Sequence, residues 1–213
     1  MTYSELIKIL LDKTPSRLLS NQYIKEKLFE LIPELEECDG FDQHSEWHPY
    51  DVFLHICHVV DDVDNTLPLR LAALFHDIGK PRKYNPTYVG DKEIGHFPLH
   101  WEESCLIFKN FAKEYNIDEE TVNLVSRLIY HHDHRFKYPE NDTQSFEELN
   151  KELIELLVSE FDKDEIQMLY NLRRADLASQ MVPLDSKLNY DIEEETILKR
   201  YGCKTKWNWN MLY

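Results

Sequence analysis

The sequence predicts an all-α protein, a bundle of helices without a substantial sheet. Apolar residues recur at helical spacing along nearly the whole chain, beginning with Leu6, Ile7 and Leu10. Only 5 of the 213 residues are glycine, which argues against a turn-rich β fold. The 42% of hydrophobic residues suffice for a proper core. We expect a helical lead-in over residues 1–45 that packs on a main domain over residues 46–213.

Prolines punctuate the helical pattern in the first half of the chain. Pro15 and Pro33 are expected to end the first two helices. Pro49 stands where the first turn of a third helix is expected, because proline is well suited to that turn. Pro68 opens a fourth helix, and Gly79 is expected to end it.

Loops and helices alternate in the second half. Residues 81–97 contain prolines and glycines and form a loop long enough to be functional, with room for a short hairpin. Asp118 is expected to cap a helix that runs into the "YHHDH" stretch. Other helices are expected over 99–115, over 145–161 and from about Asp162. The aromatic residues near the C-terminus, for which we expect core packing, are Trp207, Trp209 and Tyr213.

Charge and cysteine content narrow the classes of function. The net charge of -16 and the absence of a basic stripe argue against extended electrostatic binding to nucleic acid or to anionic membranes. The 4 cysteines are widely spaced and form no zinc-ribbon or disulfide pattern, so we expect reduced thiols. The N-terminus lacks a signal-peptide layout, and no apolar stretch has the length of a membrane span. These features predict a cytoplasmic protein.

Histidine and aspartate side chains gather at the ends or on the faces of successive predicted helices. A helical bundle that delivers imidazole and carboxylate groups inward is a common way to build a metal site. A carboxylate within an otherwise apolar helix is costly unless a cation or a donor meets it. The candidate ligands are His55, His76, Asp77, His100, His131, His132 and Asp176.

These residue types suit a divalent ion. Imidazole and carboxylate favour Mn²⁺, Fe²⁺, Co²⁺, Ni²⁺ or Zn²⁺, with Mg²⁺ as a further candidate. Asp77 has two oxygens, so it can bridge from one ion to a second. Such ions polarise a phosphoryl group and lower the pKa of water, which generates a hydroxide nucleophile. The first ion would take His55, His76, Asp77 and Asp176, and the second would take Asp77, His100 and either His131 or His132.

Each of these residues has a simpler explanation when it is taken alone. The His76–Asp77 pair can be a hydrogen-bonded polar helix ending, and His55 can be a satisfied buried polar group. The combination favours the metal site. Four further histidines are expected at surface or hydrogen-bonded positions: His44, His58, His96 and His134.

Positive charge close to the candidate ligands can hold a phosphate group. Lys80 follows the His-Asp pair, so we expect it to bind a phosphate oxygen and to take part in catalysis with Asp77. Arg82, Arg173 and Arg174 are further candidates for substrate binding. For Arg173 and Arg174, pairing with surface carboxylates is an equally good explanation.

The arrangement His55…His76-Asp77…Asp176 resembles the H…HD…D pattern of the HD superfamily of metal-dependent phosphohydrolases. "HDIGKP" is typical of its central motif. "GHFPLHWEES" resembles a stretch that supplies a second-metal histidine, which implies a role for His100, and "LIYHHD" resembles the segment that supplies a further one. The fold implied is an HD-domain helical bundle, with residues 46–213 as the HD phosphohydrolase domain.

Residues 14–180 resemble, more closely, the HD region of bacterial CCA-adding tRNA nucleotidyltransferases and poly(A) polymerases. The sequence contains no Gly-Ser pair with paired aspartates of the kind found in their catalytic head, so we do not expect nucleotide addition. The resemblance implies a phosphatase or phosphodiesterase that acts on a nucleotide-type phosphoester through metal-activated hydroxide. The alternative is a nucleotide-sensing or RNA-associated binding module with a structural metal. A second alternative keeps hydrolysis but changes the substrate to a nucleoside triphosphate or a guanosine alarmone.

Overall fold

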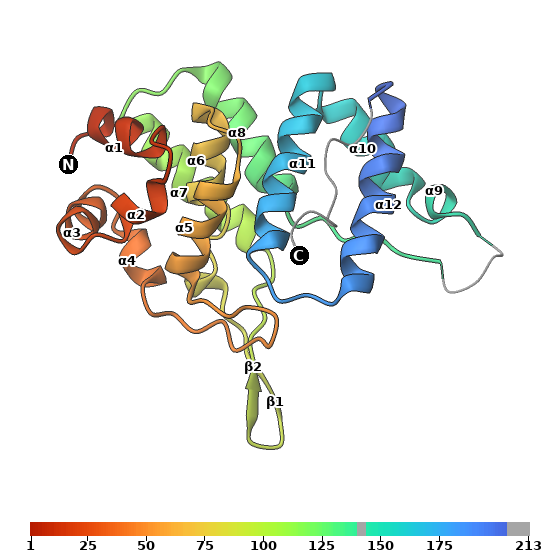
Figure 1. The fold of residues 1–213 in the computed structure, drawn as a ribbon, viewed down its shortest axis with the longest axis horizontal. Helices are drawn as coiled ribbons and strands as arrows, with labels where there is room; N and C mark the ends of the chain where they lie inside the picture. Colours follow the sequence, from red (N-terminus) through yellow and green to blue (C-terminus); the bar gives the residue numbers. More distant parts are fainter. Residues whose placement is uncertain (140–143, 204–213) are drawn as a thin grey trace. The chain divides into compact units, whose positions relative to one another are not determined.

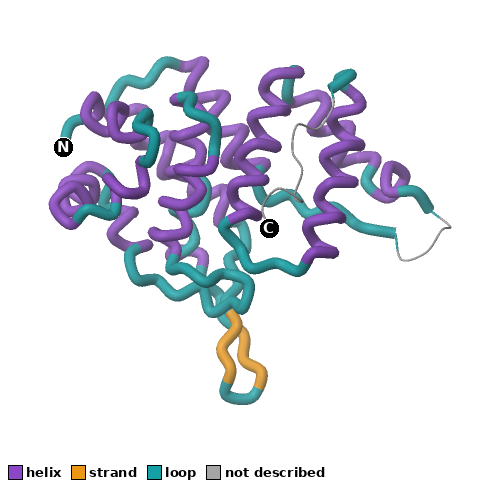
Figure 2. Tube along the Cα trace, viewed as in Figure 1, coloured by secondary structure: helices purple, strands orange, loops and turns teal. Residues whose placement is uncertain are grey.

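Helices dominate the computed structural model, which describes residues 1–139 and 144–203 (Figure 1). The one sheet within these residues is an antiparallel hairpin of β1 (Thr87–Val89) and β2 (Lys92–Ile94), drawn in orange in Figure 2. The all-α prediction and the short hairpin are therefore confirmed. Within the described part of the chain, no helix is at once long and apolar enough to cross a bilayer. The predictions for Trp207, Trp209 and Tyr213 fall outside the described residues.

The chain divides into two compact units. The first comprises Met1–Asp133 and Asn171–Met181, and the second comprises His134–Tyr170 and Val182–Tyr213. Residues 1–45 belong to the first unit together with the segment that follows them, so a separate lead-in stays a prediction.

The first unit is a helical bundle to which the hairpin is attached (Figures 1 and 2). A short 3-10 helix, η1 (Pro81–Lys83), precedes the hairpin. The helices of this unit are α1 (Tyr3–Leu10), α2 (Pro15–Leu19), α3 (Gln22–Leu31), α4 (Glu34–Cys38), α5 (Val52–Asp62), α6 (Leu67–Phe75), α7 (His100–Glu114), α8 (Glu119–His131) and the end of α11 (Lys163–Ala178).

Capping side chains fix where several of these helices begin. Asp51 accepts a hydrogen bond from the backbone N–H of Leu54 at 2.8 Å, so α5 begins at Val52. Pro49 therefore lies in the preceding loop, and its predicted place in the first turn was wrong. Pro68 does lie in the first turn of α6, as predicted. Asp118 accepts from the backbone N–H of Thr121 at 2.9 Å and caps α8, also as predicted.

Helix α6 lies at the centre of the first unit, where it packs against α5 and α8. All its residues from Leu69 to Phe75 are buried. The helix ends at Phe75 and not at Gly79, because the chain passes into turns over residues 76–80. Consequently His76 and Asp77 directly follow the end of a buried helix, and both side chains are themselves buried.

The second unit is also helical. The sequence predicted α10 and α11 but not α12, and α2 and α4 of the first unit were likewise not predicted. The core of the second unit consists of buried apolar side chains such as Leu157, Leu169 and Ile197. The helices of this unit are α9 (Phe146–Leu149), α10 (Lys151–Glu160), the first part of α11 and α12 (Leu184–Arg200).

Candidate metal centre

Four buried histidines turn their Nε2 atoms toward the two carboxylate oxygens of Asp77. His55 and His76 lie 3.1 Å and 3.2 Å from Oδ2. His100 and His132 lie 3.1 Å and 3.5 Å from Oδ1. Each oxygen of Asp77 is thus shared by two imidazoles, which is the arrangement expected of a carboxylate between two neighbouring cation positions.

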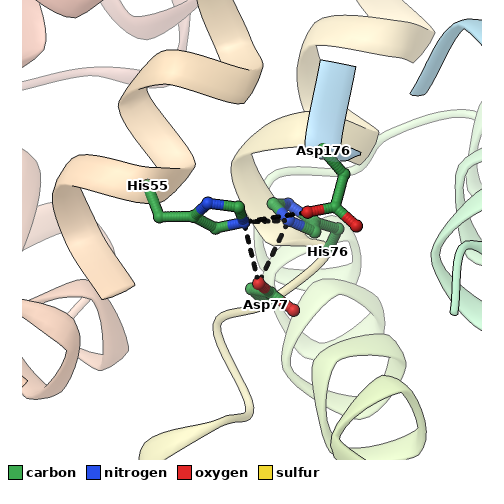
Figure 3. Close-up of side chains that lie close together, drawn as sticks. All are labelled: His55, His76, Asp77 and Asp176. Carbon is green, nitrogen blue, oxygen red and sulfur yellow. Dashed lines mark hydrogen bonds and ion pairs between the residues drawn. The ribbon is translucent and has the colours of Figure 1, made fainter. Parts of the chain in front are cut away.

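The first ligand group consists of His55, His76, Asp77 and Asp176, and one atom from each lies within 4.8 Å of the others. Figure 3 shows the four side chains converging from α5, from the end of α6 and from α11. The Nε2 atom of His55 lies 3.1 Å from Oδ1 of Asp176 and 3.3 Å from Nε2 of His76. Segments distant in sequence therefore meet at one point in the bundle, as the sequence predicted.

The second ligand group consists of Asp77, His100 and His132. The Nε2 atoms of His100 and His132 are 3.3 Å apart. Of the two histidines that the sequence could not separate, the geometry places His132 in this group, whereas His131 belongs to neither group of described residues. Since α8 ends at His131, His132 is the residue that follows the helix toward Asp77.

Hydrogen bonds to backbone carbonyls fix the protonation of three of these rings. A carbonyl oxygen can only accept, so each Nδ1 atom carries the hydrogen and each Nε2 atom keeps a lone pair. All three carbonyls come from the residue three positions earlier. The bonds join His76 to Ala73 at 2.8 Å, His100 to Phe97 at 2.9 Å and His132 to Ile129 at 2.7 Å.

A hydrogen bond with Ser179 favours the same tautomer of His55, with the hydrogen on Nδ1. Its hydroxyl donates to the backbone carbonyl of Asp176 at 2.8 Å, and therefore accepts from Nδ1 of His55, also at 2.8 Å. When His55 is neutral, its Nε2 lone pair consequently faces the carboxylates. Ser179 was not predicted from the sequence, because a serine separated by 124 residues from its histidine gives no local pattern.

The ligand cluster fits a cation. Two Nε2 lone pairs at 3.3 Å cannot hydrogen-bond to each other when both hydrogens sit on Nδ1, and they also face carboxylate oxygens. Burial disfavours charge on Asp77, yet His76 and Lys80 hold the pKa of its carboxyl well below the ordinary value. Burial also disfavours charge on His55, but in the metal-free protein hydrogen bonds from a protonated Nε2 to Asp176 and Asp77 outweigh burial and raise the pKa of the ring. Asp77 is therefore an ionised carboxylate, and His55 can hold a proton at the position where a metal cation would lie.

Nitrogen and oxygen donors of this kind suit Mn²⁺, Fe²⁺, Co²⁺, Ni²⁺ and Zn²⁺. The first group offers four protein residues, and the second offers three. A centre with fewer protein ligands retains positions for water or substrate, as catalytic metal sites do. The arrangement is therefore compatible with Lewis-acid chemistry on a bound ester.

Lys80 lies beside this centre, whereas Arg82 is engaged elsewhere. The ammonium of Lys80 is 2.6 Å from Oδ2 of Asp77 and donates to Oε1 of Gln43 at 2.8 Å. Arg82 forms an ion pair at 2.7 Å with Glu37, and its other pairs join it to Glu34 and Glu103. These carboxylates occupy its guanidinium, so the substrate-binding prediction for Arg82 gains no support from its contacts.

Arg173 acts on the backbone at the end of α8. Its Nη1 donates to the carbonyl of His132 at 2.9 Å and to that of His131 at 3.3 Å. An arginine at the end of a helix satisfies carbonyls that have no partner within the helix. Arg173 therefore helps to place His132, while Arg174 is buried next to it. Substrate binding by either arginine stays a prediction.

Comparison with known proteins identifies related sequences. A family described as "HD domain" matches residues 47–167, more than half of the 213-residue chain. A multifunctional CCA protein of Methylobacillus flagellatus is 30% identical over 134 residues, which is 61% of this chain and 31% of the relative. A multifunctional CCA protein of Ralstonia nicotianae is 38% identical over 100 residues, covering 44% of this chain and 23% of the relative. The chain thus spans less than a third of the length of these relatives.

Proposed function

Since the chain belongs to the HD domain family, we propose that it is a metal-dependent phosphohydrolase that acts on a nucleotide-type phosphoester. The observation that carries this proposal is the pair of ligand groups that share Asp77. Resemblance to part of the multifunctional CCA proteins supports a nucleotide-type substrate but not nucleotide addition, because the resemblance covers only part of those relatives.

In this proposal the two ligand groups hold one divalent ion each, and Asp77 bridges them. When bound, such ions polarise a phosphoryl oxygen and lower the pKa of water. The ions would be held by His55, His76, Asp77 and Asp176 at the first site and by Asp77, His100 and His132 at the second.

The chain's own residues orient the substrate and limit access of water. Lys80 is 6% exposed, and its ammonium would neutralise one phosphate oxygen beside Asp77. His55, His76 and His100 are buried, so electrostatic interactions at the centre act in a medium of low polarity, where electrostatic stabilisation is strong. Asp176 is less buried, with 18% of its side chain exposed, which places the accessible edge of the centre at this residue.

The experiment is to purify the protein, measure bound metal by elemental analysis, and assay hydrolysis of an aryl phosphate, a bis-aryl phosphate and a panel of nucleotides with Mn²⁺, Co²⁺ or Ni²⁺. We expect turnover that requires metal. Asp77→Asn should abolish metal binding and hydrolysis together, because Asp77 serves both ligand groups. The control is Asp91→Asn, which changes an exposed carboxylate on the hairpin.

The outcomes separate the candidate functions. Bound metal without turnover on any ester would favour a binding module with a structural metal. Turnover confined to nucleoside triphosphates or guanosine alarmones would keep the reaction and change the substrate. Full activity in Asp77→Asn would refute the proposed bridging role.

A further inference from the structure

A buried side chain from the loop before α5 fixes the ammonium of Lys80. Oε1 of Gln43 accepts a hydrogen bond from Nζ of Lys80 at 2.8 Å, and Nε2 of Gln43 donates to the backbone carbonyl of Tyr50 at 3.3 Å. An ammonium can only donate, so the amide oxygen must face Lys80. Gln43 is 1% exposed, which means that its amide has been withdrawn from water to make these two bonds.

The segment of residues 95–97 that follows β2, called the hairpin base, also contacts the ammonium of Lys80. Nζ of Lys80 lies 5.5 Å from the ring centroid of Phe97, within the range of a cation–π contact. The ring of Phe97 packs in turn against Tyr84, with centroids 5.6 Å apart, and against Phe41 at 6.4 Å. Lys80 is therefore held by a carboxylate, an amide and an aromatic ring, from three separate segments.

The segment that follows β2 also holds Gln43 itself. Gly95 donates its backbone N–H to the carbonyl of His44 at 3.1 Å. A Cβ atom on Gly95 would lie 2.2 Å from the backbone oxygen of Gln43, a distance that no side chain can accept. The close approach of these two backbones therefore requires glycine at this position.

We propose that Gln43 is a positioning residue for Lys80, and that the hairpin base keeps Gln43 in place for this task. The inference rests on the proposed function, in which Lys80 binds a phosphate oxygen. A lysine side chain is flexible and loses conformational entropy when it is immobilised on a ligand. Gln43 and Phe97 already immobilise the Lys80 side chain in the folded protein. Less conformational entropy is therefore lost when phosphate binds to the ammonium.

The test measures binding of inorganic phosphate to the Mn²⁺-loaded protein by isothermal titration calorimetry, in a double-mutant cycle of Gln43→Met and Lys80→Met. Gln43→Met keeps the length of the side chain but removes the acceptor. We expect it to weaken phosphate binding about tenfold, as loss of a hydrogen bond to a charged group does. The same change in the Lys80→Met background should have little effect, because the acceptor then has no ammonium to hold.

Further variants separate positioning from folding. Gln22→Ala, which alters an exposed glutamine on α3, is the control and should bind phosphate as the wild type does. Gly95→Ala should weaken phosphate binding without altering any ligand or Lys80, because it displaces the backbone of Gln43. Metal content should remain that of the wild type in Gln43→Met.

Three results would overturn the inference: no phosphate binding by the loaded wild type, an equal effect of Gln43→Met in both backgrounds, or loss of metal in Gln43→Met. Failure of the proposed function is distinguishable. A protein that hydrolyses no ester but shows the coupling between Gln43 and Lys80 would refute the reaction and support the positioning role.

Discussion

Imidazole orientation decides whether histidines and aspartates in one pocket can hold an ion. At this centre every Nδ1 hydrogen is taken by an oxygen outside the cluster, and every Nε2 lone pair is turned inward. Three of the oxygens are backbone carbonyls, which mutation cannot remove. The hydroxyl of Ser179 is the exception, and it offers a direct test of the importance of orientation.

Ser179→Ala removes the acceptor for Nδ1 of His55 while leaving all ligands in place. We expect about a 10- to 100-fold loss of affinity for the first ion, the usual effect of losing such a partner. Binding at the second group, which contains His100 and His132, should persist. Titration with Mn²⁺ followed by electron paramagnetic resonance measures both affinities. Ser159→Ala, on the exposed face of α10, is the matched control, and an equal loss there would contradict the prediction.

The lowered pKa of His48 predicts how the stability of the metal-free protein depends on pH. Burial, with the positive charge of Lys80 and of His55 as smaller causes, lowers the pKa of His48 from 6.5 to about 4, while the carboxylates of Asp176 and Asp77 oppose the shift. At a pH between these two pKa values, His48 binds a proton in the unfolded chain but not in the folded chain. The free energy of unfolding should therefore decrease as the pH falls from 6.5 to 4, by on the order of 2 kcal/mol from this group.

Urea unfolding of the metal-free protein between pH 4 and pH 7 measures this effect. His48→Gln should show a shallower decrease than the wild type. His96→Gln changes an exposed histidine beside the hairpin and should leave the dependence unaltered. If both variants follow the wild type, His48 does not contribute to the acid sensitivity.

The start of α7 illustrates how an element places a ligand. Gly79 donates its backbone N–H to Oγ of Ser104 at 3.0 Å. A Cβ atom on Gly79 would lie 2.6 Å from the backbone oxygen of His100 and 2.8 Å from Cβ of Glu103. The turn that carries Asp77 and the first turn of α7 can thus approach each other only when this residue is glycine.

Gly79→Ala should push the first turn of α7 away and move His100 from Oδ1 of Asp77. We expect the second ion to bind at least about tenfold more weakly, while the first is retained. Elemental analysis after dialysis should then report one ion in place of two.

Gly90→Ala separates this effect from backbone strain. Gly90 has φ +62 at the hairpin turn, and a Cβ there meets no atom within 4 Å. The substitution should cost about 1 kcal/mol of stability but leave the metal content unchanged. Loss of the second ion in both variants would attribute the effect of Gly79→Ala to general destabilisation.

Local patterns in the sequence sufficed to predict most helices of the first unit. Apolar periodicity and the Asp118 cap predicted α7 and α8 closely, because these signals lie within the element itself. The start of α5 was wrong because proline and aspartate both mark helix beginnings, and the hydrogen bond of Asp51 decides in favour of aspartate. The short α2 and α4 carry too few residues for a period to be visible.

The candidate ligands were predictable from local sequence motifs, whereas the residues that support them were not. His55, His76, Asp77, His100 and Asp176 belong to recognisable sequence motifs, and the structure brings them together. The choice between His131 and His132 needed the point at which α8 ends. The supporting residues Gln43 and Ser179 depend on contacts across 37 and 124 residues, which carry no sequence pattern.

At the scale of the whole molecule, the ligand set belongs to a single compact unit assembled from two stretches of the chain. Asp176 comes from the stretch Asn171–Met181, whereas the other ligands come from Met1–Asp133. The residues between these stretches form part of the second unit. A bound ion would therefore join the two stretches of the first unit.

Metal binding should consequently stabilise the first unit selectively. A free metal concentration one hundred times the dissociation constant adds about 2.7 kcal/mol to the stability of the bound state. Hydrogen exchange followed by mass spectrometry should show slower exchange in α5, in α6 and in residues 171–181 when Mn²⁺ replaces a chelator. Exchange in α10 of the second unit should change little, and an equal change in α10 would contradict this prediction.

The backbone of Leu99 has a consequence for protein engineering. This residue immediately precedes His100 and adopts a left-handed conformation with φ 59, yet its side chain caps nothing and is 46% exposed. A leucine pays about 1 kcal/mol or more for that conformation, whereas asparagine tolerates it well. Leu99→Asn, a single substitution next to the candidate ligand His100, should therefore raise the midpoint of thermal unfolding by relieving this backbone strain.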